Sequence, residues 1–234
     1  MNMILGTIAA ELEIEESDLR KSLDSAAERK RYVKIPKKSG DGFRRLVIPP
    51  QEHKLIQYWT TQNILSKLAL SPHATAFHKG ASVVENARRH AGGIYFVRMD
   101  ISDFFPSIES ADLIKFLLSI DSSNPIIGSA DDRTYMDTLF HDGRCAIGYP
   151  ISPHVANLVM KPIDDAIADR LNEESDLLGN PVYTRYADDI TISISRKGFK
   201  SDVLDIVRTA IHNAKSPSLK INNSKTKFGS RLRR

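Results

Sequence analysis

The stretch "VYTRYADDITISI", Val182 to Ile194, places two adjacent carboxylates between two runs of strand-forming residues. After the acidic pair, isoleucine occupies every second position, which is the two-residue period of a half-buried strand. The pattern predicts a hairpin with Asp188 and Asp189 at its tip. Acidic residues are common in turns because they hydrogen-bond to nearby backbone, so this stretch alone also fits an ordinary turn.

A second stretch favours a functional role for the acidic pair over an ordinary turn. In "FVRMDISDFFPSI", Phe96 to Ile108, a β-branched and aromatic run ends at Asp100. A carboxylate at a strand end and carboxylates at a hairpin tip can meet at one edge of a sheet. Crowded carboxylates repel one another unless cations lie between them, and hard oxygen ligands of this kind select Mg²⁺. Two such ions, about 3.5 to 4 Å apart, can hold both the attacking and the leaving oxygen of a phosphoryl transfer.

The rest of the chain supplies helices around these strands. Helical patterns or start signals occur at residues 11–30, 51–70, 109–120, 152–167 and 203–211. Ser152 followed by Pro153 is a typical helix start, and Pro162 is expected to kink that helix. Strands in hairpins, interspersed with helices, predict an α+β fold with helices packed on an antiparallel sheet.

Composition sets further bounds. The chain has 234 residues, 41% of them hydrophobic, which suffices for a real core. No apolar run approaches the ~18 residues of a membrane span, and the N-terminus has no basic region ahead of its apolar stretch. A single cysteine, Cys145, excludes an internal disulfide framework and a Cys-based zinc site. We therefore expect a cytoplasmic protein without a membrane partner.

Positive charge is unevenly distributed, although the formal net charge is only +4. Residues 206–234 contain eight Lys or Arg and no Asp or Glu, and residues 29–48 contain eight Lys or Arg against Asp41 alone. Such blocks are either solvated faces or surfaces that follow a phosphate backbone, and charge alone does not choose between these readings.

Taken together, the motifs resemble a known family. The strand "FVRMDISDFFPSI", the segment "GYPISPHVANLVM", the hairpin "YADD" and the later "LKINNSKTKF" follow the order of the reverse transcriptase palm motifs, and "IPKKSGDGFRRLVIPP" is similar to the family's fingers hairpin. The resemblance implies a right-hand polymerase with an N-terminal helical segment at 1–31, fingers at 32–92 and a palm at 93–234. Helices within 109–140 are possible further parts of the fingers.

The pentapeptide "NARRH", residues 86–90, is similar to the Asn-Ala-x-x-His signature of bacterial retron reverse transcriptases. The resemblance implies that Asn86, Arg88 and His90 bind RNA. It also implies an enzyme that copies part of its own structured non-coding RNA into DNA from a 2′-hydroxyl primer, with a role in phage defence beside an effector protein. Read without the resemblance, the pentapeptide is an exposed polar helix.

By similarity, Asp100, Asp188 and Asp189 are the catalytic carboxylates, and with the Ile101 carbonyl they hold two Mg²⁺ ions. Phe105 would exclude a 2′-hydroxyl and favour deoxynucleotides. The other residues expected at the nucleotide are the amides of Asp103 and Phe104, the cations Lys37 and Arg44 with Lys38 and Arg45 as near alternatives, Pro150, Ile151, and a late lysine, Lys225 or Lys227, near the pyrophosphate. The ordinary alternatives are a core phenylalanine for Phe105 and a solvated basic turn for the fingers hairpin.

The sequence also departs from the family. Ile151 and Ser152 stand where many relatives have glutamine after the proline, so contact with the nucleotide there is expected from apolar or backbone groups. The chain ends before the expected Val-Thr-Gly signature and helical thumb, which predicts poor processivity. Two other functions stay open: an RNA-binding scaffold that holds an effector, and a different bacterial reverse transcriptase of intron or abortive-infection type.

Overall fold

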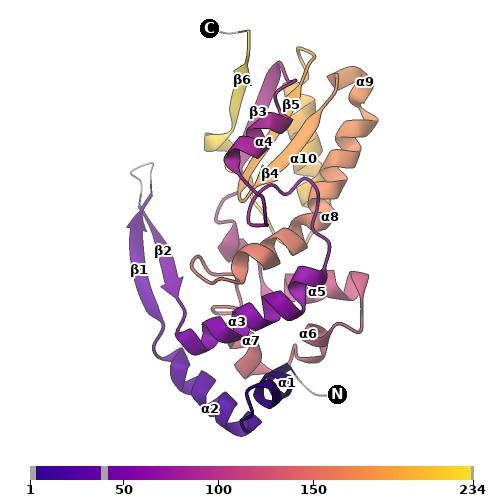
Figure 1. Cartoon of the computed structure of the whole chain (residues 1–234). Coiled ribbons are helices and arrows are strands. Elements are labelled where there is room, and N and C mark those ends of the chain that lie inside the picture. The colour runs from indigo at the N-terminus through magenta and orange to yellow at the C-terminus, as the bar shows by residue number, and fades with distance from the viewer. Residues whose placement is uncertain (1–3, 38–41, 233–234) are drawn as a thin grey trace. The chain divides into compact units, whose positions relative to one another are not determined.

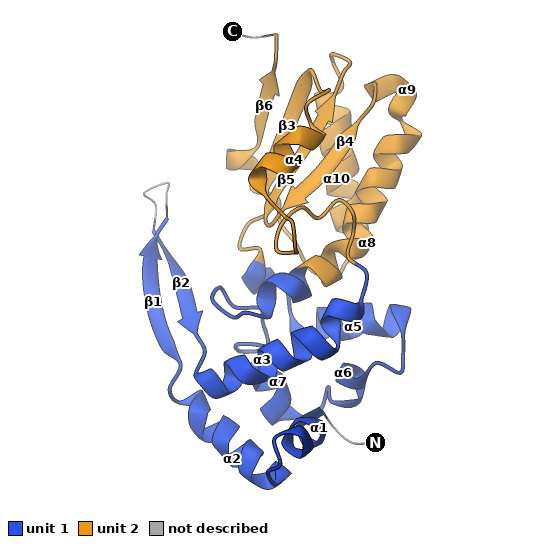
Figure 2. Cartoon of the chain, in the orientation of Figure 1, with its two compact units in different colours: residues 1–69, 105–156 blue, residues 70–104, 157–234 orange. Residues whose placement is uncertain are grey.

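Figure 1 shows the chain, a computed structural model in which residues 4–37 and 42–232 are described. Residue contacts divide the chain into two compact units, coloured separately in Figure 2. The first comprises Met1–Ala69 and Phe105–Ala156, and the second comprises Leu70–Phe104 and Asn157–Arg234. Each unit is therefore built from two separate segments. The fingers and palm boundaries drawn from the sequence stay a prediction.

The first unit is mainly helical. Its elements are α1 (Ile4–Glu11), α2 (Glu16–Ala27), β1 (Arg31–Pro36), β2 (Phe43–Ile48), α3 (Gln51–Asn63), α5 (Ser110–Ile120), α6 (Pro125–Gly128), α7 (Arg133–Leu139) and the 3₁₀ turns Leu65–Lys67 and Phe105–Ser107. Polar contacts join these helices. The Gln57 side-chain amide of α3 donates to the Thr138 carbonyl of α7 at 2.7 Å, and the Arg20 guanidinium of α2 contacts the Asp132 carboxylate at 2.6 Å.

The two strands of the first unit form the predicted basic hairpin. They pair antiparallel from Arg31 opposite Ile48 to Pro36 opposite Phe43. The Val47 amide donates to the Ile147 carbonyl at 2.8 Å, which joins the hairpin to the "GYP" segment. Gly148 in that segment has a φ of +106°, and a Cβ there would collide with the Val47 carbonyl oxygen. Glycine alone accommodates both this positive φ and the close approach of the Val47 carbonyl oxygen.

The second unit is a sheet with helices on its faces. Its elements are α4 (Val83–Arg89), β3 (Tyr95–Asp100), most of α8 (Ser152–Glu173), α9 (Ser175–Leu178), β4 (Val182–Tyr186), β5 (Asp189–Ile194), α10 (Lys200–Ala214), the 3₁₀ turn Asn223–Lys225 and β6 (Lys227–Ser230). The strand order is β4-β5-β3-β6, with every pair antiparallel. Pro162 lies inside α8, which continues through it.

The two faces of this sheet differ in chemistry. Alternation along the strands sends one set of side chains toward α8 and α10, and these are apolar apart from one arginine: Val97, Met99, Tyr183, Arg185, Ile190, Ile192 and Ile194. The other face carries Thr184, Ser193, Asp100 and Asp189. Figure 1 shows α8 and α10 on one side of the sheet and the short helix α4 on the other.

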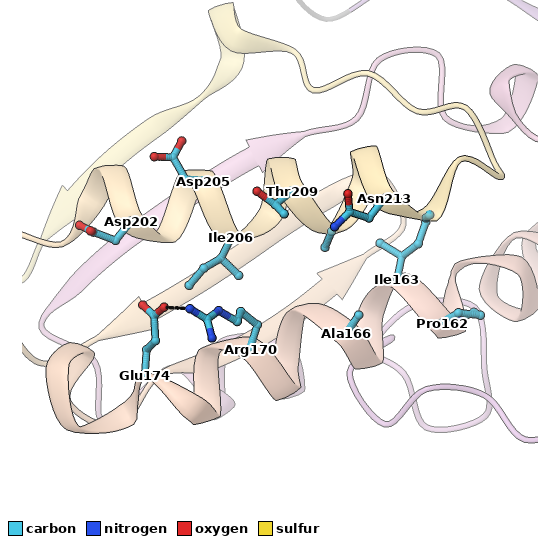
Figure 3. A pocket seen from close by; sticks show the side chains of 12 residues that line it. Pro162, Ile163, Ala166, Arg170, Glu174, Asp202, Asp205, Ile206, Thr209 and Asn213 are labelled. Carbon is cyan, nitrogen blue, oxygen red and sulfur yellow. Dashed lines mark hydrogen bonds and ion pairs between the residues drawn. The ribbon is translucent and has the colours of Figure 1, made fainter.

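A groove of about 670 Å³ lies between α8 and α10. Figure 3 shows Ile163, Ala166 and Ile206 along it, with Glu174 and Asp205 at its rim. The groove is on the sheet face opposite Asp100 and Asp189, so it is separate from the acidic residues. Among the described residues, no helix is both long and apolar enough to cross a bilayer.

Candidate active site

The hairpin β4–β5 carries the acidic pair at its tip. Its register sets Tyr186 opposite Asp189, which leaves Ala187 and Asp188 as a two-residue turn. Ala187 has a φ of +57°. Residues with a side chain adopt this left-handed region uncommonly, at a cost of roughly 1 to 2 kcal/mol. The turn therefore needs support from the surrounding structure.

The end of β3 lies beside this tip. Asp100 and Asp189 are directly opposite each other in the antiparallel pair β3–β5. One residue further, the Ile101 amide donates to the Asp188 carbonyl oxygen at 2.9 Å. The structure thus brings together at one sheet edge the strand-end acid and the hairpin-tip acids, which lie 88 and 89 residues later in the sequence. Asp100 and Asp189 also line one small cavity of about 130 Å³.

The Asp100 carboxylate forms an ion pair with a lysine side chain. The Lys225 ammonium donates to both carboxylate oxygens, at 3.0 and 2.9 Å. The Asp100 backbone is fixed too, because the Asn222 amide donates to its carbonyl at 2.7 Å. The sequence left Lys225 and Lys227 open as the late lysine. Both line the cavity, and Lys225 is the one that contacts Asp100.

The donor set suits a hard divalent cation, since the two carboxylates share one cavity on one sheet face. Within the described ranges, no cluster of three or more His, Cys, Asp or Glu side chains is arranged to hold an ion. An ion bound to Asp100 would have to displace the Lys225 ammonium. The site therefore offers carboxylate ligands that suit a metal ion. In this structure, one of those carboxylates is neutralised by a cation of the protein.

A buried arginine supports the hairpin from behind. Arg185 of β4 is 0% exposed, and its guanidinium makes two hydrogen bonds to the Asp164 carboxylate of α8, at 2.8 and 2.7 Å. The Tyr183 hydroxyl donates to the same carboxylate at 2.7 Å. A further guanidinium N–H donates to the Ala187 carbonyl oxygen at 3.0 Å. Helix α8 thereby holds the strained residue of the turn through Arg185.

Sequence reasoning missed Arg185, Asp164 and also Arg98, which lines the small cavity. A signal was present for two of them. Arg98 stands two residues before Asp100 and so shares its sheet face. Arg185 occupies an inward position in a strand of otherwise uncharged residues, where an arginine must be paired. The position of its partner Asp164, on a helix, cannot be read from strand alternation.

The residues after β3 divide between the units. Phe104 is buried, with the Arg185 guanidinium carbon 5.6 Å from its ring centroid, so this side chain belongs to the packing behind the hairpin. Asp103 is exposed and has a φ of +46°. Phe105 begins the second segment of the first unit and is half-buried. The roles predicted for the Asp103 and Phe104 amides and for the Phe105 ring stay predictions.

The other predicted nucleotide contacts belong to the first unit. Lys37 and Arg44 are exposed on the basic hairpin, whereas the Arg45 guanidinium lies 4.2 Å from the Tyr32 ring centroid. Lys38 lies outside the described residues. Pro150 is half-buried. The Ile151 side chain is fully buried, so any contact it makes with a nucleotide would have to come from its backbone.

The "NARRH" segment contains α4 and its C-cap. Asn86 accepts a hydrogen bond from the Thr75 hydroxyl at 2.8 Å, and Arg88 is exposed near Glu85. His90 is 5% exposed, and its ring nitrogens lie 2.8 Å from the Ser193 hydroxyl and 2.7 Å from the Thr184 hydroxyl. Burial, assisted by the charge of Arg89, lowers the pKa of His90 to about 4. Of the three predicted RNA contacts, Arg88 is the one whose side chain is open to solvent, and the assignment stays a prediction.

An antiparallel sheet that presents acidic residues from a strand end and a hairpin tip on one face is the palm arrangement expected of a template-directed polymerase. The family model described as reverse transcriptase (RNA-dependent DNA polymerase) matches residues 35–233, and the chain belongs to this family. The predicted α+β fold with fingers and palm is thereby confirmed.

Curated relatives narrow the family. Retron Ec73 reverse transcriptase of Escherichia coli is 35% identical over 201 residues, which cover 83% of this chain and 62% of the relative. Retron Ec86 reverse transcriptase of the same species is 31% identical over 216 residues, covering 91% of this chain and 63% of the relative. The predicted retron type is confirmed. The chain spans about six-tenths of the length of these relatives.

Solved structures show the same fold in a distant protein. Apo telomerase from Candida tropicalis, truncated from its C-terminal domain, matches with a TM-score of 0.55 at 13% identity, over 92% of this chain and 56% of that one. At such low identity the likeness concerns the fold alone.

Proposed function

We propose that this chain is the catalytic fingers and palm of a retron-type RNA-directed DNA polymerase, a nucleotidyltransferase that uses dNTPs. The observation that carries the proposal is the register of β3 and β5, which sets Asp100 opposite Asp189 beside the hairpin tip that bears Asp188. Carboxylates placed directly opposite each other repel unless cations lie between them, so this pairing favours a site that takes divalent ions over a scaffold, with Lys225 as the cation of the resting state.

The proposed reaction is attack by a primer hydroxyl on the α-phosphorus of the incoming nucleotide, as the α–β phosphate bridge breaks and pyrophosphate leaves. Reverse transcriptases in general use divalent metal ions. Asp100, Asp188, Asp189 and the Ile101 carbonyl would hold two Mg²⁺ ions, which would supply positive charge to the phosphoryl transfer. The Lys225 ammonium, which contacts Asp100, would offset the negative charge of the departing pyrophosphate.

The remaining roles follow the resemblance. Phe105 selects deoxynucleotides, the backbone amides of Asp103 and Phe104 face the triphosphate, and Pro150 and Ile151 border the base. The fingers cations contact phosphate oxygens, a task for which the planar fork of arginine is well suited: Lys37, Lys38 and Arg44.

The proposed template is the protein's own structured non-coding RNA, bound in part through Asn86, Arg88 and His90, and the product is a joined RNA–DNA molecule. An effector protein for phage defence is the proposed further partner. Purification from the host distinguishes the retron function from its alternatives. A branched RNA–DNA molecule that co-purifies with the protein supports the retron function. RNA without attached DNA favours the scaffold, and an intron RNA favours the intron type.

Incorporation of a labelled dNTP on an RNA template with Mg²⁺ is the direct test. We expect Asp188→Asn to reduce incorporation at least about 100-fold, because loss of one charge-stabilising group commonly costs this much. Asp176→Asn is the matched control, since Asp176 is an exposed acid on α9 of the same unit. A folded Asp188→Asn protein with unchanged incorporation would contradict the proposed role.

A further inference from the structure

A second cavity, of about 700 Å³, lies at the opposite end of β3 from Asp100. It is formed where β3 begins, β5 ends and β6 runs along the sheet edge, and Tyr95 and Phe228 are among its lining residues. Tyr95 is five residues before Asp100, which corresponds to about 17 Å along a strand. Its volume is within the range of about 300 to 1,000 Å³ that is typical of ligand pockets.

This cavity, which we call the β6 cavity, is on the other sheet face from the acidic residues. Phe228 is opposite Val97 in the β3–β6 pair, and Val97 belongs to the face that α8 and α10 cover. Asp100 is three residues after Val97 and so points the other way. A ligand in the β6 cavity would therefore not compete with a nucleotide at Asp100 for the same side chains.

The charges around the β6 cavity are all positive. Its charged lining residues are Arg196, Lys197 and Lys200, all of them exposed. Within the part of the chain that the structure describes, none of the three is in an ion pair. The groove between α8 and α10 differs, because Arg170 there contacts Glu174 at 2.5 Å. Three unneutralised cations around one cavity favour an anionic ligand.

An aromatic ring adds a second kind of contact. Phe228 is 45% exposed, and the Lys200 ammonium lies 5.0 Å from its ring centroid. Proteins that bind single strands without sequence preference combine a basic groove, which follows the backbone, with aromatic rings on which bases stack. Cations and an exposed ring around one cavity fit this combination.

We propose that the β6 cavity binds a single-stranded polynucleotide segment, with an unpaired base stacked on Phe228 and the neighbouring phosphates held by Arg196, Lys197 and Lys200. The site goes beyond the proposed polymerase activity, because it lies on the other sheet face and requires no dNTP or metal. It would hold a strand outside the active site while the reaction proceeds elsewhere on the same unit.

The role of the cations is tested by measuring oligonucleotide binding in the absence of divalent metal. Fluorescence anisotropy reports the affinity for a labelled 12-nucleotide oligouridylate and, separately, for oligodeoxythymidylate. We expect Lys197→Ala with Lys200→Ala to weaken binding about tenfold and to reduce the slope of log affinity against log salt by about 1.4, since each lost phosphate contact on a single strand contributes about 0.7. The matched control is Lys67→Ala with Lys115→Ala, which removes two exposed lysines of the first unit. Comparing the two oligonucleotides shows whether RNA or DNA is the better ligand.

The ring is tested separately. Phe228→Leu should weaken binding about tenfold and Phe228→Tyr should restore it, because base stacking requires an aromatic surface. An oligouridylate with 4-thiouridine should crosslink to peptides that contain Phe228 or Tyr95. Equal affinity and salt slope in the double-lysine variant and its control, or crosslinks that map only outside the cavity, would overturn the proposal. Incorporation on a short primer–template should be unchanged in Phe228→Leu, so loss of the site and loss of polymerase activity give different results.

Discussion

At the scale of single residues, the ion pair between Lys225 and Asp100 sets a condition on metal binding. The ammonium contacts both oxygens of the Asp100 carboxylate, whose side chain is only 11% exposed, so it occupies the groups that a divalent ion would use. A lysine on a long flexible stem can leave that position, because its rotatable bonds allow it to follow an anion such as pyrophosphate. In the resting site, Asp100 is therefore neutralised by a cation of the protein itself.

Replacing Lys225 should change metal binding and turnover in opposite directions. We expect Lys225→Met to tighten Mn²⁺ binding several-fold when nucleotide is absent, because the competing ammonium is lost, and to lower kcat for dNTP incorporation. Mn²⁺ titration followed by electron paramagnetic resonance measures the first effect. Lys227→Met is the control, since Lys227 lines the same cavity without contacting Asp100. Weaker Mn²⁺ binding in Lys225→Met would contradict the competition.

Also at this scale, Arg185 and Asp164 can be replaced together to test their support of Ala187. Removing one partner of a buried ion pair costs about 3 to 5 kcal/mol, whereas an apolar pair of similar size is often neutral or stabilising. We expect Arg185→Met with Asp164→Leu, made in a Tyr183→Phe background so that no buried hydroxyl loses its acceptor, to stay folded but to lose kcat at least about tenfold relative to that background, with little change in KM for dNTP, because the Ala187 carbonyl loses its donor. Thermal melting and steady-state kinetics measure both. A folded double variant with full kcat would show that the pair serves stability alone.

At the scale of elements, His90 joins α4 to the strands β4 and β5. The ring is buried between the hydroxyls of Thr184 and Ser193, and its pKa is lowered to about 4 from the ordinary value near 6.5. The neutral ring is therefore the form that the folded protein favours. Between these two pKa values the unfolded chain binds the proton and the folded chain does not.

The stability that His90 contributes is complete above pH 6.5 and is lost as the pH falls from 6.5 toward 4, with a slope of up to about 1.4 kcal/mol per pH unit. We expect His90→Gln to reduce this dependence, measured as the difference in free energy of unfolding by urea between pH 7.5 and pH 5.0. His212→Gln, a change at an exposed histidine near the end of α10, should leave the wild-type dependence intact. An identical pH dependence in wild type and His90→Gln would refute the assignment.

At the scale of the whole molecule, local patterns predicted the elements better than their partners. The alternating isoleucines of β5 and the run that ends at Asp100 identified both strands and their acidic ends, because strand period and burial are local properties. The contact of Lys225 with Asp100 and that of Arg185 with Asp164 depend on how distant segments pack, which no local pattern contains. The interpretation of "NARRH" as an exposed polar helix did not anticipate the burial of His90, for the same reason.

The reactivity of the Cys145 thiol reports the unfolding of the first unit. The thiol is 2% exposed, and burial raises its pKa to about 12. Since the thiolate is the reactive form, we expect alkylation by iodoacetamide at pH 8 to be at least about 100-fold slower in the native protein than in urea. Mass spectrometry against time measures the rate. Rapid labelling of the native protein would contradict the burial.

The chain passes from one compact unit to the other after residues 69, 104 and 156, so that neither unit corresponds to a continuous stretch. Strand β3 leaves the ribosome well before β5, its neighbour in the sheet. At typical synthesis rates of about 5 to 20 residues per second, that interval lasts roughly 5 to 20 seconds. During this time an apolar strand has no hydrogen-bonding neighbour from β5, and nascent chains of this protein should be clients of ribosome-associated chaperones.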